Sequence, residues 1–484
     1  MENKIELNKE ILFEAVTKKD IVTLRAIFEH DEIIDIADCL NDIDINDEDE
    51  VVKLILIFKT VRPIYTAELF SELENDLQEA IIKSLTNEQI ASLVNEMAND
   101  EMADFLTEMP ANLVNKVLTN TNIDERAKIN KLLNYKDDSA GSIMTTEYIT
   151  LLDTDTVGHA LSTVRNTGKN AETVYTLFVR NKKFDLVGVL ELDDLIFAKD
   201  EEKLIDVCDK DFHTVNVNTD QEEVARIFHR YELNAIGVTN EDNKLTGIIT
   251  IDDVLDVIKE ETDEDIAKMS NITPLENSYK HTGVFRLALK CIPWLIILMI
   301  LQAFSGMIVS AFQASITILP ALAIFTTMLC DTGGNSGLQS TTLIVRGLST
   351  GEFTNKDYGK VIWKEIRVAL IVASVVALVA FGWVVAEFYL HIITFEEGIA
   401  PGGGMPIHDD LNTRLQIGGL VGLSIFIAII LSKFVGASLP FLANVCHLDP
   451  AVMSGPLLST IVDVVTLACY FGLFSLFYFT MGWA

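Results

Sequence analysis

The sequence predicts a multidomain membrane protein with four parts: an all-α, solenoid-like N-terminal domain, a duplicated α+β domain, an acidic connecting helix and a five-helix transmembrane bundle. The mean hydropathy of the 484 residues, +0.30, is high for a soluble protein. Of the 71 acidic and 37 basic residues, residues 281–484 hold 11 and 9, which leaves 60 and 28 in residues 1–280. A strongly acidic soluble half therefore precedes an apolar half.

The acidity of the first half limits its partners. Phosphate groups attract positive charge, so we expect neither nucleic acid nor an anionic lipid surface to bind there. Solubility alone explains many acidic surfaces, but so large a surplus also favours a bound cation. Residues 1–5 lack the apolar core of a secretory signal, so we expect a cytosolic N-terminus. The six cysteines include no C-x-x-C pair and predict neither a disulfide framework nor a zinc site.

Residues 1–134 are expected to form the helical N-terminal domain. Residues 87–98 (NEQIASLVNEMA) and 99–110 (NDEMADFLTEMP) align without gaps, and their apolar positions coincide. A twelve-residue unit with helical spacing and a polar start predicts short stacked helices. A plain helical bundle is the alternative.

Residues 135–254 contain a second duplication. Residues 187–196 (VGVLELDDLI) match residues 246–255 (TGIITIDDVL), and a helix-like stretch, 157–165 or 221–231, precedes each copy. The pattern resembles a pair of CBS modules, small α+β units that sense ligands. In such modules a Thr-x-x-Asp pattern often holds the ribose of an adenine nucleotide.

That resemblance makes Thr250 and Asp253 a candidate nucleotide site, with ATP as a modulator. The first copy has Glu191 in place of the threonine, so only one such site is expected. An aspartate that caps the N-terminus of a helix is the alternative interpretation of Asp253.

Residues 255–283 are expected to form the connecting helix. The run 256–265 (DVIKEETDED) is dense in acids, and repulsion between them destabilises a helix unless counter-ions bind. A solvated charged helix is the ordinary explanation of such a run. Its position as the link to the membrane half favours a role in gating.

Residues 284–484 are expected to form five spans, near 287–311, 317–346, 364–390, 414–438 and 454–482. The forty residues from Cys291 to Cys330 carry no charge, and one span needs only about 20 residues, so this stretch holds two. Further uncharged runs lie at 368–386, 415–432 and 464–484. Only helices are expected, because irregular backbone cannot face lipid.

The basic residues near the span ends predict the orientation. Lys and Arg gather before the first span and around the second connection, whereas the third connection, residues 395–412, holds four acids and no base. The positive-inside rule therefore places the N-terminus inside and the C-terminus outside.

Two acids fall at membrane depth, Asp331 and Asp463. A charge there costs at least about 2.5–3.5 kcal/mol, so it is usually placed against a pathway or a partner. The sequence around Asp331, DTGGNSG over residues 331–337, is expected to free backbone carbonyls beside a carboxylate and an amide. Such hard oxygen ligands suit magnesium and calcium. Close helix packing is the alternative role for the glycines.

The order of parts resembles the MgtE family of magnesium transporters. The sharpest motifs are residues 331–339 (DTGGNSGLQ) followed by Arg346-Gly347, and residues 449–456 (DPAVMSGP) followed by Thr460 and Asp463. The resemblance implies a homodimeric magnesium-selective channel of the bacterial inner membrane, with its pore on the two-fold axis. It implies that Asp463 holds hydrated magnesium, with Ser459 and Asn335 beside the path.

The resemblance also implies a magnesium sensor in the soluble half, which closes the pore when magnesium is plentiful. The acids to which it maps bridging ions are Asp220, Glu222, Glu232, Asp253, Asp256, Glu261, Glu264, Asp265, Glu101 and Asp104. Without magnesium these carboxylates repel each other. Bound magnesium would pull the connecting helices over the pore.

One departure and one alternative accompany this resemblance. Some relatives carry Asn where this chain has Gly455, which puts ion affinity at the cytosolic entrance in doubt. The alternative function is an ion-gradient-coupled magnesium transporter or exporter. No phosphate-binding loop, nucleophile elbow or H-E-x-x-H helix occurs, so we do not expect an enzyme.

Overall fold

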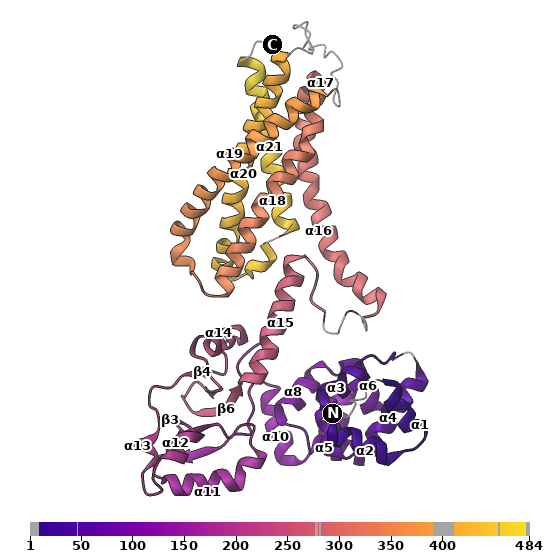
Figure 1. Ribbon diagram of the computed structural model, residues 1–484, viewed down its shortest axis with the longest axis vertical. Helices are drawn as coiled ribbons and strands as arrows, with labels where there is room; N and C mark the ends of the chain where they lie inside the picture. The colour runs from indigo at the N-terminus through magenta and orange to yellow at the C-terminus, as the bar shows by residue number, and fades with distance from the viewer. Residues whose placement is uncertain are drawn as a thin grey trace, which may run out of the picture. The chain divides into compact units, whose positions relative to one another are not determined.

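The computed structural model describes residues 9–45, 47–275, 279, 282–390, 411–453 and 455–480 (Figure 1). Two compact units divide the chain: residues 1–261 with 276–281, and residues 262–275 with 282–484. The third membrane connection, whose acids entered the orientation prediction, lies almost entirely outside the described residues. Each unit is described by itself.

The first unit begins with short helices of 8 to 13 residues. They are α1 (Lys9–Thr17), α2 (Ile21–His30), α3 (Ile33–Asn41), α4 (Glu48–Thr60), α5 (Pro63–Ser71), α6 (Asn75–Ser84), α7 (Asn87–Val94), α8 (Asn99–Glu108), α9 (Ala111–Asn120) and α10 (Ile123–Leu132). Many contact the helix after next: α3 on α5, α5 on α7, α7 on α9. The twelve-residue repeat corresponds to α7 and α8, and its apolar positions are buried in one continuous core.

The first α+β module follows. It contains β1 (Thr150–Leu152), α11 (Val157–Thr167), a 3₁₀ turn (Gly168–Asn170), β2 (Thr176–Arg180), β3 (Leu186–Glu191), α12 (Leu192–Phe197) and the short α13 (Leu204–Val207). Strand β1 pairs parallel with β2, and β2 pairs antiparallel with β3.

The second module repeats this topology with β4 (Thr214–Asn216), α14 (Gln221–Tyr231), β5 (Ala235–Thr239) and β6 (Leu245–Thr250). Both hairpins carry an irregularity at the same place, between Val179 and Arg180 and between Val238 and Thr239. The duplication inferred from the sequence is therefore repeated in the strand register.

The glycine shared by the two copies has a steric reason. A Cβ on Gly188 would lie 2.5 Å from the Cys208 sulfur, and one on Gly247 would lie 2.6 Å from the Met144 sulfur. The segment that follows or precedes each hairpin thus crosses its strand at backbone distance, which only glycine allows.

Helix α15 (Ile251–Met269) leaves β6 directly and continues past the end of the first unit. The connecting helix thus begins four residues before the expected 255 and ends at 269. Its apolar side chains Val254 and Val257 are buried against the second module, which fixes its first turns there.

The second unit consists of α16 (Val284–Ala311), α17 (Gln313–Ile318), α18 (Ala321–Ser349), a 3₁₀ turn (Asn355–Asp357), α19 (Tyr358–Tyr389), α20 (Leu411–Val445), a second 3₁₀ turn (Pro450–Met453) and α21 (Pro456–Thr480). Four described helices, α16, α19, α20 and α21, are long and apolar enough to cross a membrane. Helix α18 has 29 residues but is not apolar enough to be counted among them, so the span expected near residues 317–346 stays a prediction. Helix α20 packs against α18, α19 and α21 and holds the centre of the unit.

The glycine-rich segment of α18 does not open the backbone. The helix runs unbroken from Ala321 to Ser349, so the expectation of freed carbonyls at residues 331–337 is wrong. The glycines instead permit close packing, because a Cβ on Gly436 of α20 would lie 2.4 Å from the Gly337 carbonyl oxygen. Thr341 then donates a 2.7 Å hydrogen bond to the Gly436 carbonyl. Small residues thus let α18 and α20 approach at backbone distance.

A buried polar network joins three helices of this unit. The Ser340 hydroxyl of α18 donates to the Glu365 carboxylate of α19 at 2.7 Å, and the Lys433 ammonium of α20 donates to Ser340 at 3.1 Å. All three side chains are buried. Charged groups in such a place are stable only when they are hydrogen-bonded to each other.

Candidate functional site

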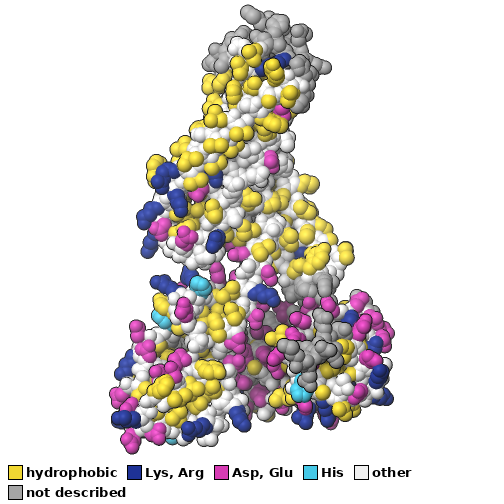
Figure 2. Space-filling view, viewed as in Figure 1, with side chains coloured by type: hydrophobic (Ala, Val, Ile, Leu, Met, Phe, Trp, Pro, Cys, Tyr) yellow, Lys and Arg dark blue, Asp and Glu magenta, His cyan; other side chains and the backbone are white. Residues whose placement is uncertain are grey.

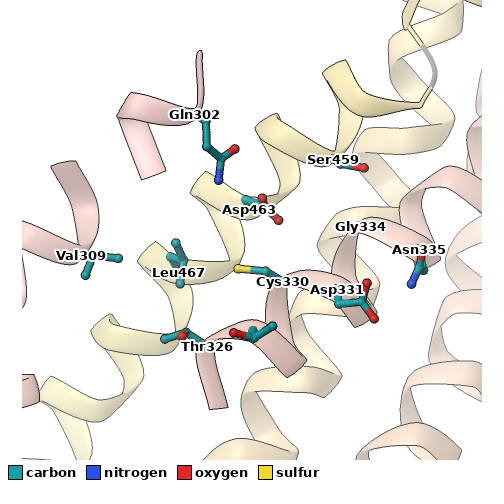
Figure 3. Close-up of a pocket in the computed structure, with 11 residues that line it drawn as sticks. Gln302, Val309, Thr326, Cys330, Asp331, Gly334, Asn335, Ser459, Asp463 and Leu467 are labelled. Atoms are coloured by element: carbon teal, nitrogen blue, oxygen red, sulfur yellow. The ribbon is translucent and has the colours of Figure 1, made fainter. Parts of the chain in front are cut away.

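A cavity of about 420 Å³ lies among α16, α18 and α21 of the second unit (Figure 3). Its polar lining comes from Thr326, Thr327, Asp331 and Asn335 on α18, from Ser459 and Asp463 on α21, and from Gln302 on α16. The structure thus places all three residues predicted for the pore, Asp463, Ser459 and Asn335, around one space.

Asp463 occupies the middle of this group. Figure 3 shows the Gln302 amide directed toward the Asp463 carboxylate, with the Cys330 sulfur on its other side. Both side chains interact with that carboxylate, and Asp331 acts on it through its charge. Two carboxylates, two amides and three hydroxyls on one cavity form a set of hard oxygen ligands, and several of them can also bind the water shell of an ion.

Helix packing explains why these side chains meet. A Cβ on Gly333 would lie 3.0 Å from the Thr466 hydroxyl, and one on Gly334 would lie 3.5 Å from the Ser459 hydroxyl. The small residues of α18 therefore bring α21 close, so that Asp331 and Asp463 line the same cavity.

Gln302 and Cys330 are members of the cavity that sequence reasoning missed. Both lie in the uncharged run of residues 291–330, which the sequence assigned only to membrane spans. The amide of a glutamine within an apolar stretch was the available signal for Gln302. For Cys330 the signal was its position directly before Asp331.

A second candidate site is an acidic cluster in the first unit, between α8 and the start of α15. It gathers Glu101 and Asp104 of α8 with Asp253 of α15, all three predicted for the sensor. Further carboxylates act on these through their charge, namely Glu72, Asp100, Glu172, Asp252 and Glu260. Figure 2 shows acidic side chains gathered over this region of the unit.

The cluster is electrostatically strained when it holds no cation. Burial, followed by repulsion from Asp100, raises the pKa of Glu101 and of Asp104 to about 7. Burial raises the pKa of Asp253 to about 7 as well, in spite of its hydrogen bond with Thr250. Asp100 is itself buried, and its Oδ1 atom has no hydrogen-bond partner. Such groups are expected to take up protons or a cation near neutral pH.

The remaining predicted sensor acids lie elsewhere. Asp256 acts electrostatically on Glu72 at the edge of the cluster. Asp220 caps α14 by accepting from the Glu222 N–H at 3.0 Å, and Glu232 ends that helix with a φ of 52°. Glu261 accepts from the Gln221 amide at 2.7 Å. Glu264 and Asp265 belong to the second unit, where Glu264 pairs with Lys268 at 2.5 Å.

No three His, Cys, Asp or Glu side chains within the described residues are already arranged to hold a metal ion directly. The acids of the cluster are close enough to repel each other but do not converge on one point. Hydrated magnesium, which keeps several of its waters, suits such an arrangement.

The two residues of the candidate nucleotide site, Thr250 and Asp253, form a hydrogen bond with each other. The buried Thr250 hydroxyl donates to the Asp253 carboxylate at 2.8 Å. A ribose that bound Asp253 would therefore compete with Thr250 and with the acidic cluster for the same carboxylate.

The end of α15 contacts the segment before α21 within the second unit. Lys268 forms ion pairs with Glu264 at 2.5 Å and with Asp449 at 2.7 Å. Although burial lowers the pKa of Lys268, these two acids raise it above its usual range. Gly455 has a φ of +61°, and a Cβ there would lie 2.3 Å from the Met269 carbonyl oxygen. The glycine at this position thus has a steric reason in this chain, because no larger residue fits beneath α15.

Comparison with known proteins matches three parts of the chain to family models. The model of the divalent cation transporter family MgtE matches residues 326–473, that of the MgtE intracellular N domain matches residues 31–138, and that of the CBS domain matches residues 140–201 and 204–260. The magnesium transporter MgtE of Thermus thermophilus is 33% identical over 345 residues, which cover 71% of each chain. The chain belongs to the MgtE family.

Other MgtE proteins give the same result. The magnesium transporter MgtE of Bacillus subtilis is 32% identical over 74% of each chain. That of Enterococcus faecalis is 30% identical over 73% of this chain and 72% of its own. As an MgtE protein with long apolar helices, the chain is a multi-pass membrane protein.

Two solved structures also match. The soluble part of a magnesium transporter is 29% identical, with 52% of this chain and 97% of that chain covered and a TM-score of 0.48. The cytosolic domain of the Mg2+ channel MgtE in complex with ATP is 30% identical, with 51% and 98% covered and a TM-score of 0.48.

Proposed function

We propose that this MgtE chain is a magnesium-selective channel of the bacterial inner membrane, open at low and closed at high cytosolic magnesium. The observation that carries the proposal is the cavity in which Asp463, Asp331, Asn335 and Ser459 meet among membrane helices. Carboxylates at such a position mark an ion path more often than they serve packing.

The channel is proposed to act as a homodimer, with α18 and α21 lining a shared pore. Asp331, Asn335 and Gln302 are exposed in the single chain although they belong to a membrane unit. Polar side chains cannot remain against lipid, and a second copy placed across them would enclose a hydrated path. In this arrangement α18 also crosses the membrane as the second of five spans, the N-terminus is cytoplasmic and the C-terminus is outside.

The acidic cluster of the first unit is proposed as the sensor. Magnesium would bind the carboxylates of α8 and α15 and relieve their repulsion, which favours the compact form of that unit. A ligand shifts such an equilibrium only by its preference for one form, and several ions together supply a larger shift than one. Helix α15 carries the result onward, because its last turn is tied to Asp449 beside the start of α21.

ATP is proposed as a modulator that acts through Thr250 and Asp253. A solved relative binds ATP in its cytosolic domain. Asp253 also belongs to the acidic cluster, so a nucleotide bound to Asp253 would alter the affinity of the cluster for magnesium. Bound magnesium would then alter the affinity of the chain for the nucleotide by the same factor.

Magnesium influx into proteoliposomes tests the channel. The full chain is reconstituted without sodium or proton gradients, and influx is measured with a magnesium dye at low and at high magnesium on the sensor side. Influx at low magnesium that stops at high magnesium supports the gated channel. Influx that requires an imposed ion gradient contradicts it and indicates the coupled transporter instead.

A further inference from the structure

A basic cavity of about 270 Å³ lies in the acidic first unit, away from both sites described above. Three cations line it, Lys128 and Lys131 of α10 and Arg180 of β2, together with the hydroxyls of Thr146 and Tyr148 and the ring of Phe184. No carboxylate belongs to the described lining. Three cations around one cavity are unexpected in a half of the chain that holds 60 acidic and 28 basic residues.

Two polar atoms of this lining are buried without a partner. The Arg180 Nε and the Thr146 Oγ1 are shielded from solvent, and neither makes a hydrogen bond within the described chain. Leaving such groups unpaired costs roughly 1–3 kcal/mol each, and more when the group is charged. Native proteins rarely retain them, so their presence on one cavity indicates a missing acceptor.

The fold aims Arg180 at this cavity. The residue lies at the end of β2, where the pairing with β3 shifts register after Val179. Such irregularities turn a side chain away from the regular strand direction. The guanidinium then stacks 4.1 Å from the centre of the Phe184 ring, and one terminal nitrogen donates to the Asn181 carbonyl at 3.5 Å, while its Nε has no acceptor.

The two lysines also lack an ion-pair partner. Neither Lys128 nor Lys131 forms a salt bridge with a described carboxylate, in contrast to Lys244 of the adjacent hairpin, which pairs with Asp185. Burial lowers the pKa of Lys131. Burial raises the pKa of Glu147, and Lys128 lowers it only in part. The positive charge of the cavity is therefore largely uncompensated.

We propose that this cavity binds a small phosphate-bearing anion. The edge of a guanidinium offers paired donors that match phosphate oxygens, and two ammonium groups and two hydroxyls complete the donor set. The rings of Tyr148 and Phe184 also line the cavity, so free phosphate, a phosphomonoester and a nucleotide are the forms of the anion to compare.

The site differs from the Thr250–Asp253 pair. A threonine that lines the cavity, Thr246, lies near the hairpin end of β6, and Thr250 lies at the other end of that strand. Four residues of strand separate them by about 13 Å. The lining comes from α10 and from both CBS modules, so a bound anion would hold the helical domain to the CBS pair and stabilise the first unit.

Anion binding to the purified full chain tests the proposal. Inorganic phosphate is titrated in magnesium-free buffer at constant ionic strength, and affinity is measured by calorimetry and by the shift in unfolding temperature. The variants are Arg180→Gln and Lys131→Gln, and the matched control is Lys183→Gln, which removes an exposed charge from the adjacent turn. We expect both cavity variants to weaken phosphate binding by roughly tenfold, as loss of a charge-assisted hydrogen bond implies, and the control to bind like the parent.

AMP and ATP distinguish the source of the phosphate. AMP that binds more tightly than phosphate and loses this advantage in Tyr148→Ala indicates a nucleotide, whereas equal affinity indicates a simple phosphate or phosphomonoester.

Phosphate binding that is absent, or that is unchanged in Arg180→Gln and Lys131→Gln, overturns the proposal. Nucleotide binding that is lost in Asp253→Asn but kept in both cavity variants, without phosphate binding, overturns it too. Lys131→Gln keeps the test decisive if Arg180→Gln does not fold. Magnesium flux does not enter this readout, so the result is independent of the proposed channel.

Discussion

At the scale of single residues, Asp463 is the group on which the proposed ion path depends. It is flanked by Gln302 and Cys330 and lies in the field of Asp331. Replacement by asparagine keeps its size and removes its charge, so the change isolates the electrostatic contribution.

We therefore expect Asp463→Asn to reduce magnesium influx into proteoliposomes by at least about tenfold, the factor that corresponds to 1.4 kcal/mol. The matched control is Glu387→Gln, a carboxylate of α19 that hydrogen-bonds Trp383 outside the cavity. Equal influx through Asp463→Asn and the parent would remove Asp463 from the path.

Gly455 gives a second prediction at this scale. Alanine at a φ of +61° costs roughly 1–2 kcal/mol, and its Cβ would meet the Met269 carbonyl at 2.3 Å. We expect Gly455→Ala to displace the end of α15, which lowers the unfolding temperature and leaves influx less sensitive to high magnesium. The control is Gly472→Ala, because a Cβ there meets no atom within 4 Å. Normal closure in Gly455→Ala would contradict a gating role for this contact.

At the scale of elements, the network of Ser340, Glu365 and Lys433 holds α18, α19 and α20 together. We expect Lys433→Met to lower stability by about 3–5 kcal/mol, because Glu365 is then buried with an uncompensated charge. The double variant with Glu365→Gln should recover part of the loss. Thermal inactivation in detergent measures both. Strictly additive losses would show that the two residues do not act as a pair.

Elements also show what could be predicted from the sequence. The duplicated modules were predicted because residues 187–196 and 246–255 align without gaps and share a glycine and two aspartates, and a helix-like stretch before each copy predicted α11 and α14. Long uncharged runs indicated the membrane helices. The course of α18 was predicted wrongly near Asp331, because glycine was taken as a helix breaker, whereas contact with α20 and α21 stabilises the helix there.

The sites were predicted only in part, for a physical reason. Asp463 stands out as a charge in an apolar run, which is a local signal. Glu172 joins Glu101 and Asp253 only through packing between distant segments, and no local pattern in the sequence indicates this. The sequence likewise does not indicate that Arg180 lacks an ion-pair partner, because that depends on the residues that pack around it.

At the scale of the whole molecule, the acidic cluster predicts a dependence of stability on pH. Glu101, Asp104 and Asp253 have pKa values raised to about 7 in the folded chain, from ordinary values near 4. Between these values the folded chain binds protons that the unfolded chain has lost, so stability falls as pH rises through about 7. Magnesium bound at the proposed sensor would compete with these protons.

We therefore expect magnesium to raise the unfolding temperature of the full chain more at pH 8 than at pH 6. The neutralised variant Glu101→Gln/Asp104→Asn/Asp253→Asn should lose most of this difference, and Asp242→Asn, in the exposed turn between β5 and β6, should keep it. A magnesium effect of equal size at both pH values would argue against the cluster as the sensor.

The identical strand registers of the two CBS modules have one more consequence. They make each copy an internal reference for the other, position by position: Arg180 pairs with Leu186 in the first hairpin as Thr239 pairs with Leu245 in the second. Thr239 is buried, and its hydroxyl donates to the Val215 carbonyl, so this position of the second module needs no ligand. At the equivalent position of the first module, Arg180 lines a cavity. We therefore expect the first hairpin to accommodate Arg180→Thr, because the second hairpin carries threonine at the equivalent position.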